Sequence, residues 1–153
     1  MPGLFENYQV VLLDASFFVS EFSESVRTGL KDASHVTVAD TFCAEIEHYC
    51  ALLSCDKNTA YAVNISFLED VKLSYLYADK SKRICSDAWG ALAILLEQKV
   101  KTVLITANQL LIQRVVLHNL NVDIYDLNSN KFIYYAEFYL YKRNYELKKL
   151  SKD

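Results

Sequence analysis

The chain has 153 residues, of which 52% are hydrophobic and 23% are charged, with a formal net charge of −3. This length suits one compact domain, and the composition excludes the disordered and fibrous classes. The longest apolar run, residues 88–96, is about half as long as a bilayer span, so we expect no transmembrane segment. The first six residues lack a basic stretch followed by an apolar one, so we expect a cytoplasmic protein.

Strand-like and helix-like segments alternate along the first half of the chain. Residues 9–14 form a short apolar, β-branched run that ends at Asp14, which predicts a buried strand followed at once by a helix. Residues 35–39 predict a second strand. Asp40 then caps an expected helix that continues to about Leu53. Apolar residues at mostly helical spacing predict a further helix within residues 58–77.

The second half continues this alternation. Residues 87–98 predict a helix capped by Ser86, residues 101–106 a strand, residues 110–119 a helix and residues 121–126 a final strand. Because parallel neighbours need crossover connections, this order predicts an α/β fold with a central parallel sheet and helices on both faces, in three layers. We expect residues 1–130 to form this domain and residues 131–153 an amphipathic helical extension.

Charge is distributed unevenly between these two parts. Residues 131–153 hold six basic and three acidic residues, whereas residues 1–130 hold ten basic and sixteen acidic ones. An acidic body argues against charge-driven nucleic-acid binding and is compatible with carboxylates that hold cations. In the extension, Phe132, Tyr135 and Tyr139 follow near-helical spacing, which predicts a helix buried along this face, within one chain or across a homodimer.

The four cysteines give little support to a zinc site. They contain no CxxC pair, and the three histidines are scattered, so we interpret the cysteines as buried free thiols.

Several polar residues are expected at the carboxyl edge of the sheet, where ligands of open α/β sheets bind. Asp14 ends the first strand, Glu45 lies in the second turn of the helix that follows the second strand, and Asp87 opens a later helix. Thr106 and Asn108 end the strand that returns the chain to the same edge. Each residue also has a purely structural interpretation. Asp14 can be a strand terminator, Asp87 a residue that interacts with the helix dipole, and Asn108 a turn former. Three carboxylates at one edge repel one another, and bound divalent cations would explain them.

These residues carry a resemblance. The segments Leu12-Leu13-Asp14-Ala15-Ser16, Glu45 on a helix, Asp87-Ala-Trp-Gly-Ala-Leu-Ala and Val103-Leu104-Ile105-Thr106-Ala107-Asn108 resemble the PIN-domain nuclease family, also described as PilT N-terminus-like, over roughly residues 8–127. The resemblance implies a metal-dependent hydrolase, a ribonuclease that holds Mg²⁺ or Mn²⁺. It implies metal ligands at Asp14, Glu45 and Asp87, with Thr106 and Asn108 completing the catalytic set.

Asn108 departs from the family pattern, which has Asp there. An amide oxygen can coordinate a cation or hold a water, but the change removes one negative charge. Asp123 or Asp126 on the following strand could partly replace it. The segments around Asp14 and Thr106 also resemble the phosphorylation site of a response-regulator receiver. Their separation of 92 residues, however, is too large for the single βα unit that a receiver needs.

The sequence therefore supports two alternative functions. One is a ribonuclease. In it Lys80, Lys82 and Arg83 could contact the RNA backbone, and the alternative for these three residues is a solvated loop. The other is a PIN-like binding or assembly module that has lost catalysis, with Asn108 as the trace of that loss. Toxin–antitoxin ribonucleases of the VapC type are one branch that the chain resembles, which implies an antitoxin-like protein as a partner beside the RNA substrate.

Overall fold

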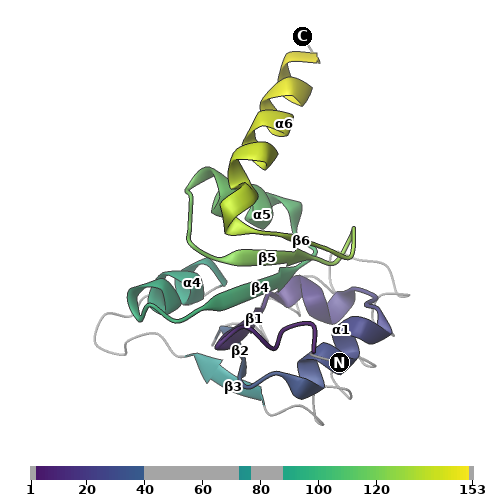
Figure 1. Ribbon diagram of the computed structural model, residues 1–153, viewed down its shortest axis with the longest axis vertical. Coiled ribbons are helices and arrows are strands. Elements are labelled where there is room, and N and C mark those ends of the chain that lie inside the picture. Colours follow the sequence, from purple (N-terminus) through teal and green to yellow (C-terminus); the bar gives the residue numbers. More distant parts are fainter. Residues whose placement is uncertain (1–2, 40–72, 77–87, 152–153) are drawn as a thin grey trace.

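The computed structural model describes residues 3–39, 73–76 and 88–151 (Figure 1). Its strands and helices, in chain order, are β1 (Val10–Leu13), the 3-10 helix η1 (Ala15–Val19), α1 (Glu24–Asp32), β2 (Val36–Ala39), β3 (Leu73–Leu76), α4 (Ala88–Glu97), β4 (Thr102–Thr106), α5 (Gln109–Leu117), β5 (Asp123–Asp126), β6 (Lys131–Ile133), the 3-10 helix η2 (Tyr135–Glu137) and α6 (Phe138–Ser151). None of the helices described is long and apolar enough to cross a membrane.

The strands form one mixed sheet in the order β3-β2-β1-β4-β5-β6. The first five are mutually parallel, and β6 joins β5 antiparallel. The α/β class is therefore confirmed. From β1 the chain proceeds outward through β2 and β3, and it then returns to the other side of β1 as β4. The strand order thus reverses between β1 and β4, and in sheets of this kind such a switch point leaves a crevice at the carboxyl ends of the two strands.

Alternate residues of the strands pack into two separate apolar cores. Val11, Leu13, Val103 and Ile105 pack in a cluster with Val26 and Leu30 of α1. Their neighbours pack in a second cluster with α4 and α5; it includes Val10, Leu12, Leu104, Leu92, Ile112 and Val115. Because successive side chains of a strand point to opposite faces, both faces of the central strands are covered. Burial on both sides explains why β1 and β4 are almost continuously apolar, and it holds their carboxyl ends rigidly.

Two expectations for the first part of the chain need correction. The helix expected directly after Asp14 is the short 3-10 helix η1, and α1 begins only at Glu24. Residues 73–76, expected within a helix, form strand β3, which pairs with β2 from Val36↔Leu73 to Ala39↔Leu76. Four residues are too few to separate a helical from an extended pattern, so pairing with β2 decides the conformation. The helix expected from Asp40 to Leu53 lies outside the described residues.

The extension also differs from the expectation. A helix is confirmed for residues 138–151 but is wrong for residues 131–137, which form β6 and η2. Because the helix begins only at Phe138, the side chains that face the core differ from the expected ones. Within the chain Phe138 is 1% exposed in the second core, whereas Tyr139 is 67% and Tyr135 38% exposed. The expected burial of Tyr135 and Tyr139 inside one chain is therefore wrong. Figure 1 shows α6 leading away from the sheet beyond β6.

Asp123 connects the start of β5 to the segment before β1 and to the start of η2. The Tyr8 hydroxyl donates to Asp123 Oδ2 at 2.6 Å, and the backbone N–H of Tyr135 donates to Oδ1 at 2.8 Å. Burial, reinforced by the hydrogen bond to Asp123, raises the pKa of the Tyr8 phenol above its ordinary value. The phenol therefore stays protonated in the folded protein under conditions where the unfolded chain would lose its proton.

We expect Tyr8→Phe to change how stability depends on alkaline pH. In the wild type, the folded state binds one more proton than the unfolded state above about pH 10, so the contribution of Tyr8 falls as the pH rises through that range. Phe cannot titrate, and its stability curve should be flatter there, although it loses about 1–2 kcal/mol at neutral pH with the hydrogen bond. Urea unfolding at several pH values measures this. The exposed Tyr134, substituted to Phe, is the matched control, and identical pH slopes for the two variants would contradict the assignment.

Candidate functional site

Asp14 and Thr106 lie at the switch point of the sheet. Asp14 follows the last residue of β1, and Thr106 is the last residue of the neighbouring β4. Strand pairing carries on to the end of both strands, since the Asp14 N–H donates to the carbonyl of Ile105 at 3.1 Å. Both side chains are buried, with Asp14 5% and Thr106 0% exposed. The sheet thus brings together two residues 92 positions apart, as predicted.

One oxygen of Asp14 receives all the hydrogen bonds that the described residues donate to its carboxylate. Oδ2 accepts from the Ser16 hydroxyl at 2.7 Å, from the Thr106 hydroxyl at 2.9 Å and from the Ser16 backbone N–H at 3.3 Å. The last of these bonds makes Asp14 the N-cap of η1. Three donors on one oxygen compensate for the removal of the carboxylate from water and fix the plane of the side chain.

The two hydroxyl groups are themselves held in one orientation. The N–H of Ala107 donates to Ser16 Oγ and the N–H of Asn108 donates to Thr106 Oγ1, both at 2.9 Å. The two hydroxyl oxygens lie 3.1 Å apart. Because each hydroxyl accepts from a backbone amide, its single proton is available to Asp14. The loop after β4 therefore positions Asp14 through Ser16 and Thr106.

The other oxygen of Asp14 is Oδ1, and within the part of the chain that the structure describes no group donates a hydrogen bond to it. A buried carboxylate oxygen without a donor is unusual, because leaving a charged acceptor unsatisfied costs more than a hydrogen bond returns. A hard divalent cation such as Mg²⁺ or Mn²⁺ takes oxygen ligands of this kind. The open oxygen thus fits a cation, and Ser16 and Thr106 would orient the ligand from behind.

Asn108 has a clear local role. Its Oδ1 accepts from the backbone N–H groups of Leu110 at 3.1 Å and of Leu111 at 3.3 Å, which makes Asn108 the N-cap of α5. Two amides that the first turn leaves without helical partners are satisfied in this way. The Asn108 backbone N–H, by contrast, belongs to the Asp14 network through Thr106. The structure therefore joins Asn108 to the site by its main chain and uses its amide oxygen for the helix.

The two aspartates of β5 stand at opposite edges of the sheet. Asp126 pairs in register with Thr106 and is 8% exposed, so it shares the carboxyl edge with Asp14. Its oxygens accept from the Asn128 backbone N–H, the Ser129 hydroxyl and the Gln109 amide, at 2.9–3.3 Å. These bonds hold the turn into β6. Asp123 begins β5 and lies at the amino edge, bonded to Tyr8 and Tyr135. Of the two, only Asp126 stands at the edge where it could supply charge to the site.

The remaining predicted site residues cannot be placed. Glu45 and Asp87, and the basic residues Lys80, Lys82 and Arg83, lie outside the described residues, as do the four cysteines. Helix α4 begins at Ala88, so the helix predicted over residues 87–98 is confirmed from that position to Glu97. Among the described residues, no three His, Cys, Asp or Glu side chains gather closely enough to hold a metal ion.

Ser16 is a member of this site that the sequence argument did not select. It supplies two of the three donors to Asp14 and contacts Thr106. The signal was present in the sequence, since a Ser two residues after a strand-ending Asp can donate to that carboxylate in the turn that follows. Serine is common at such turns for purely local reasons, however, and only the position of β4 beside β1 gives Ser16 its second partner.

Comparison with known proteins adds no further identification. No protein-family model matches the chain, and no curated protein matches it significantly.

Proposed function

We propose that the chain is a metal-dependent endoribonuclease of the PIN-domain type, with a three-layer α/β/α arrangement and an RNA substrate. The observation that carries this proposal is the Asp14 carboxylate, which is 5% exposed and has one oxygen held by three donors and the other without a donor among the described residues. Its position at the switch point of the sheet is the place where α/β proteins bind ligands. A purely structural aspartate would be expected to use both oxygens.

Each residue has a distinct task in this proposal. Asp14 Oδ1, with Glu45 and Asp87 as the further ligands, would hold one Mg²⁺ or Mn²⁺. Ser16 and Thr106 keep Asp14 in a single orientation through their bonds to Oδ2. When bound, the metal supplies Lewis-acid activation of a water and offsets negative charge at the phosphodiester. Asn108 positions the loop after β4 by capping α5 and by donating its N–H to Thr106.

Removal of the metal tests the proposal directly. We expect the purified chain to cleave labelled single-stranded RNA with Mg²⁺ or Mn²⁺, to lose this activity in EDTA, and to regain it when Mn²⁺ is added in excess. The products are resolved on a denaturing gel. Cleavage that continues at the same rate in EDTA would contradict the mechanism, because no protein group described at the site activates water without a cation.

A second candidate function is a PIN-like binding or assembly module without nuclease activity. The use of the Asn108 side chain as a helix cap favours it, because a neutral cap leaves the carboxyl edge with one charge fewer. In either case the natural setting that we propose is the cytoplasm, with an antitoxin-like protein or a second copy of the chain as partner. The exposed Tyr135 and Tyr139 would then form part of the contact between copies.

Asn108→Asp separates these two functions. Asp caps helices as well as Asn does, so α5 should stay folded, and the second carboxylate oxygen adds charge beside the site. A unit charge within several Å of a dication should tighten Mn²⁺ binding by about tenfold or more. Calorimetric titration with Mn²⁺ and RNA cleavage are measured together. If the wild type is inactive and Asn108→Asp gains both Mn²⁺ affinity and RNA cleavage, the result favours the impaired module. An unchanged Mn²⁺ affinity would show that position 108 does not act on the cation.

A further inference from the structure

The loop that orients the Ser16 and Thr106 hydroxyls is itself held by another segment of the chain. Ala107 and Asn108 connect β4 to α5, and their N–H groups donate to Ser16 Oγ and Thr106 Oγ1. The Ala107 carbonyl accepts from the side-chain amide of Asn128 at 2.8 Å. Asn128 lies in the turn between β5 and β6. The turn after β5 therefore contacts the loop that orients both hydroxyls.

A peptide group transmits this contact because it is planar. The Ala107 carbonyl and the Asn108 N–H are the two ends of one trans peptide, so they point in opposite directions. When Asn128 holds the carbonyl, the N–H is directed toward Thr106 Oγ1, to which it donates at 2.9 Å. Because the Thr106 oxygen accepts from this amide, its single proton is donated to Asp14 Oδ2, also at 2.9 Å.

The preceding peptide is held in the same way. The Thr106 carbonyl accepts from the N–H of Leu127 at 3.0 Å. The other end of that peptide is the Ala107 N–H, which donates to Ser16 Oγ at 2.9 Å. Both amides that orient the hydroxyls thus belong to peptides whose carbonyls accept from the turn after β5. Any residue except proline can make the first bond, whereas the second needs the side-chain amide of Asn128.

Asp126 fixes the turn from which Asn128 reaches the loop. The backbone N–H of Asn128 donates to Asp126 Oδ1 at 2.9 Å, and Gln109 Nε2 donates to the same oxygen at 3.3 Å. The Ser129 hydroxyl donates to Oδ2 at 3.2 Å. Asp126 is buried, so these donors replace the water that its carboxylate loses. The main chain of Asn128 is therefore anchored where its side chain contacts Ala107.

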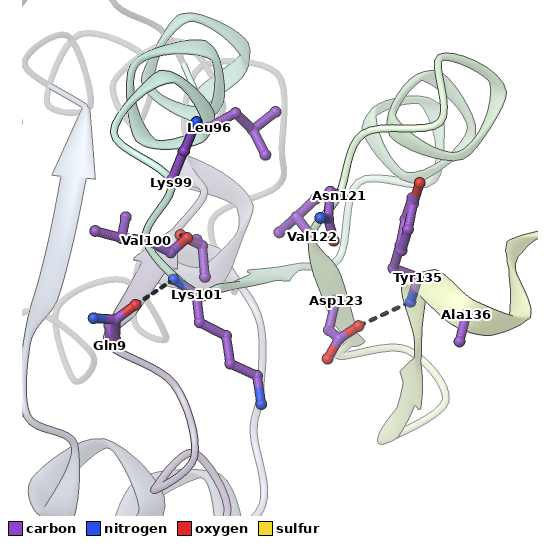
Figure 2. Close-up of a pocket in the computed structure, with 11 residues that line it drawn as sticks. Gln9, Leu96, Lys99, Val100, Lys101, Asn121, Val122, Asp123, Tyr135 and Ala136 are labelled. Atoms are coloured by element: carbon purple, nitrogen blue, oxygen red, sulfur yellow. Dashed lines mark hydrogen bonds between the residues drawn. The ribbon is translucent and has the colours of Figure 1, made fainter.

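A bond of a similar kind at the amino edge does not lead to a carboxylate. Figure 2 shows the Gln9 side chain, whose Oε1 accepts from the Lys101 N–H at 2.7 Å. The carbonyl at the other end of that peptide, from Val100, accepts from the Thr102 hydroxyl at 3.1 Å. This bond uses the only proton of the hydroxyl, so within the described residues Thr102 donates to no carboxylate. Gln9 is therefore a control for Asn128.

We propose that Asn128 is a positioning residue for Asp14. By holding the Ala107 carbonyl, Asn128 keeps the Asn108 N–H on Thr106 Oγ1. The Thr106 proton then stays directed at Asp14 Oδ2. The consequence for a bound cation rests on the proposed metal site, whereas the consequence for the peptide does not. The two consequences are therefore measured separately.

Amide hydrogen exchange of the full chain in EDTA measures the effect on the peptide. We expect Asn128→Ala to speed exchange at the Asn108 N–H about tenfold, because the loss of one hydrogen bond lets this peptide rotate. Exchange at the Ala107 N–H should change by less than about threefold, because Leu127 still holds that peptide. Ser129→Ala removes a bond within the same turn and should change neither amide. Equal exchange at Asn108 in the two variants would overturn the proposal.

Calorimetric titration with Mn²⁺ measures the effect on the proposed site. Asn128→Asp keeps the shape of the side chain but places an acceptor against the Ala107 carbonyl, so Mn²⁺ binding should weaken about tenfold. The added negative charge alone would tighten binding instead. Asn130→Asp adds the same charge two residues along the turn, where Asp tolerates the φ of 55°. Neither Asn130→Asp nor Gln9→Ala should weaken Mn²⁺ binding.

The two measurements separate this proposal from the proposed function. If Asn128→Asp binds Mn²⁺ as tightly as Asn130→Asp does, Asn128 does not position Asp14 and the proposal is overturned. If the wild-type chain binds no Mn²⁺, the proposed function fails, and the exchange rate at Asn108 alone decides whether Asn128 holds the peptide.

Discussion

We expect Asp14→Asn to lower metal-dependent RNA cleavage by at least about a hundredfold, which corresponds to ~2.7 kcal/mol of transition-state stabilisation. Asn keeps one oxygen, which can still accept from the Ser16 and Thr106 hydroxyls. Its NH₂ group then occupies the position of Oδ1, where it presents a donor instead of an anionic ligand. The variant therefore removes the charge that would hold the cation and keeps the hydrogen bonds that hold the fold. Initial cleavage rates at saturating Mn²⁺ measure the effect.

Glu97→Gln is the matched control for this experiment. It also removes one carboxylate charge, from the exposed end of α4, and should leave the cleavage rate within about twofold of the wild type. Circular dichroism confirms that both variants are folded. An Asp14→Asn protein that cleaves RNA as fast as Glu97→Gln would rule out Asp14 as a metal ligand.

The second large effect is expected from Thr106→Val, which should lower the free energy of unfolding by about 2–3 kcal/mol. Val has nearly the same shape as Thr but cannot donate to Asp14 Oδ2 or accept from the Asn108 N–H. A buried carboxylate and a backbone amide each lose a partner, and neither can reach water easily. Urea unfolding at neutral pH, with the slope checked for constancy, measures the loss.

Thr102→Val is a closely matched control, because Thr102 begins the same strand and is 3% exposed. Its hydroxyl donates to the carbonyl of Val100 at 3.1 Å, so only a neutral bond is lost, at a cost of about 1 kcal/mol. In the Asp14→Asn background the cost of Thr106→Val should fall by ~1 kcal/mol, because no charge is then left unpaired. If the two substitutions lower the free energy of unfolding equally in both backgrounds, the hydrogen bonds of Thr106 to the Asp14 network stabilise the fold no more than an ordinary neutral hydrogen bond does.

The short strands show which parts of the fold local sequence could predict. β1 and β4 are buried on both faces, so their side chains are apolar almost without interruption, and the two strands can be recognised without a partner. β3 and β6 have three or four residues each, and their apolar pattern fits either a helix or a strand. Hydrogen bonding to β2 and β5 decides their conformation, and those partners are separated from them by other chain segments or by a turn.

The site shows the same division between local and tertiary information. By itself the sequence determined that Asp14 and Thr106 end buried strands, and parallel strands of one sheet place such ends at one edge. It could not determine which oxygen of Asp14 stays open, because that depends on where the Ser16 and Thr106 hydroxyls point. Their directions are set by amides of the loop after β4, which reach Ser16 only when β4 pairs beside β1. The atoms that fix these hydrogen-bond directions lie about 90 residues apart in the sequence. Only the tertiary structure brings them together, and so only it could decide which oxygen accepts the bonds.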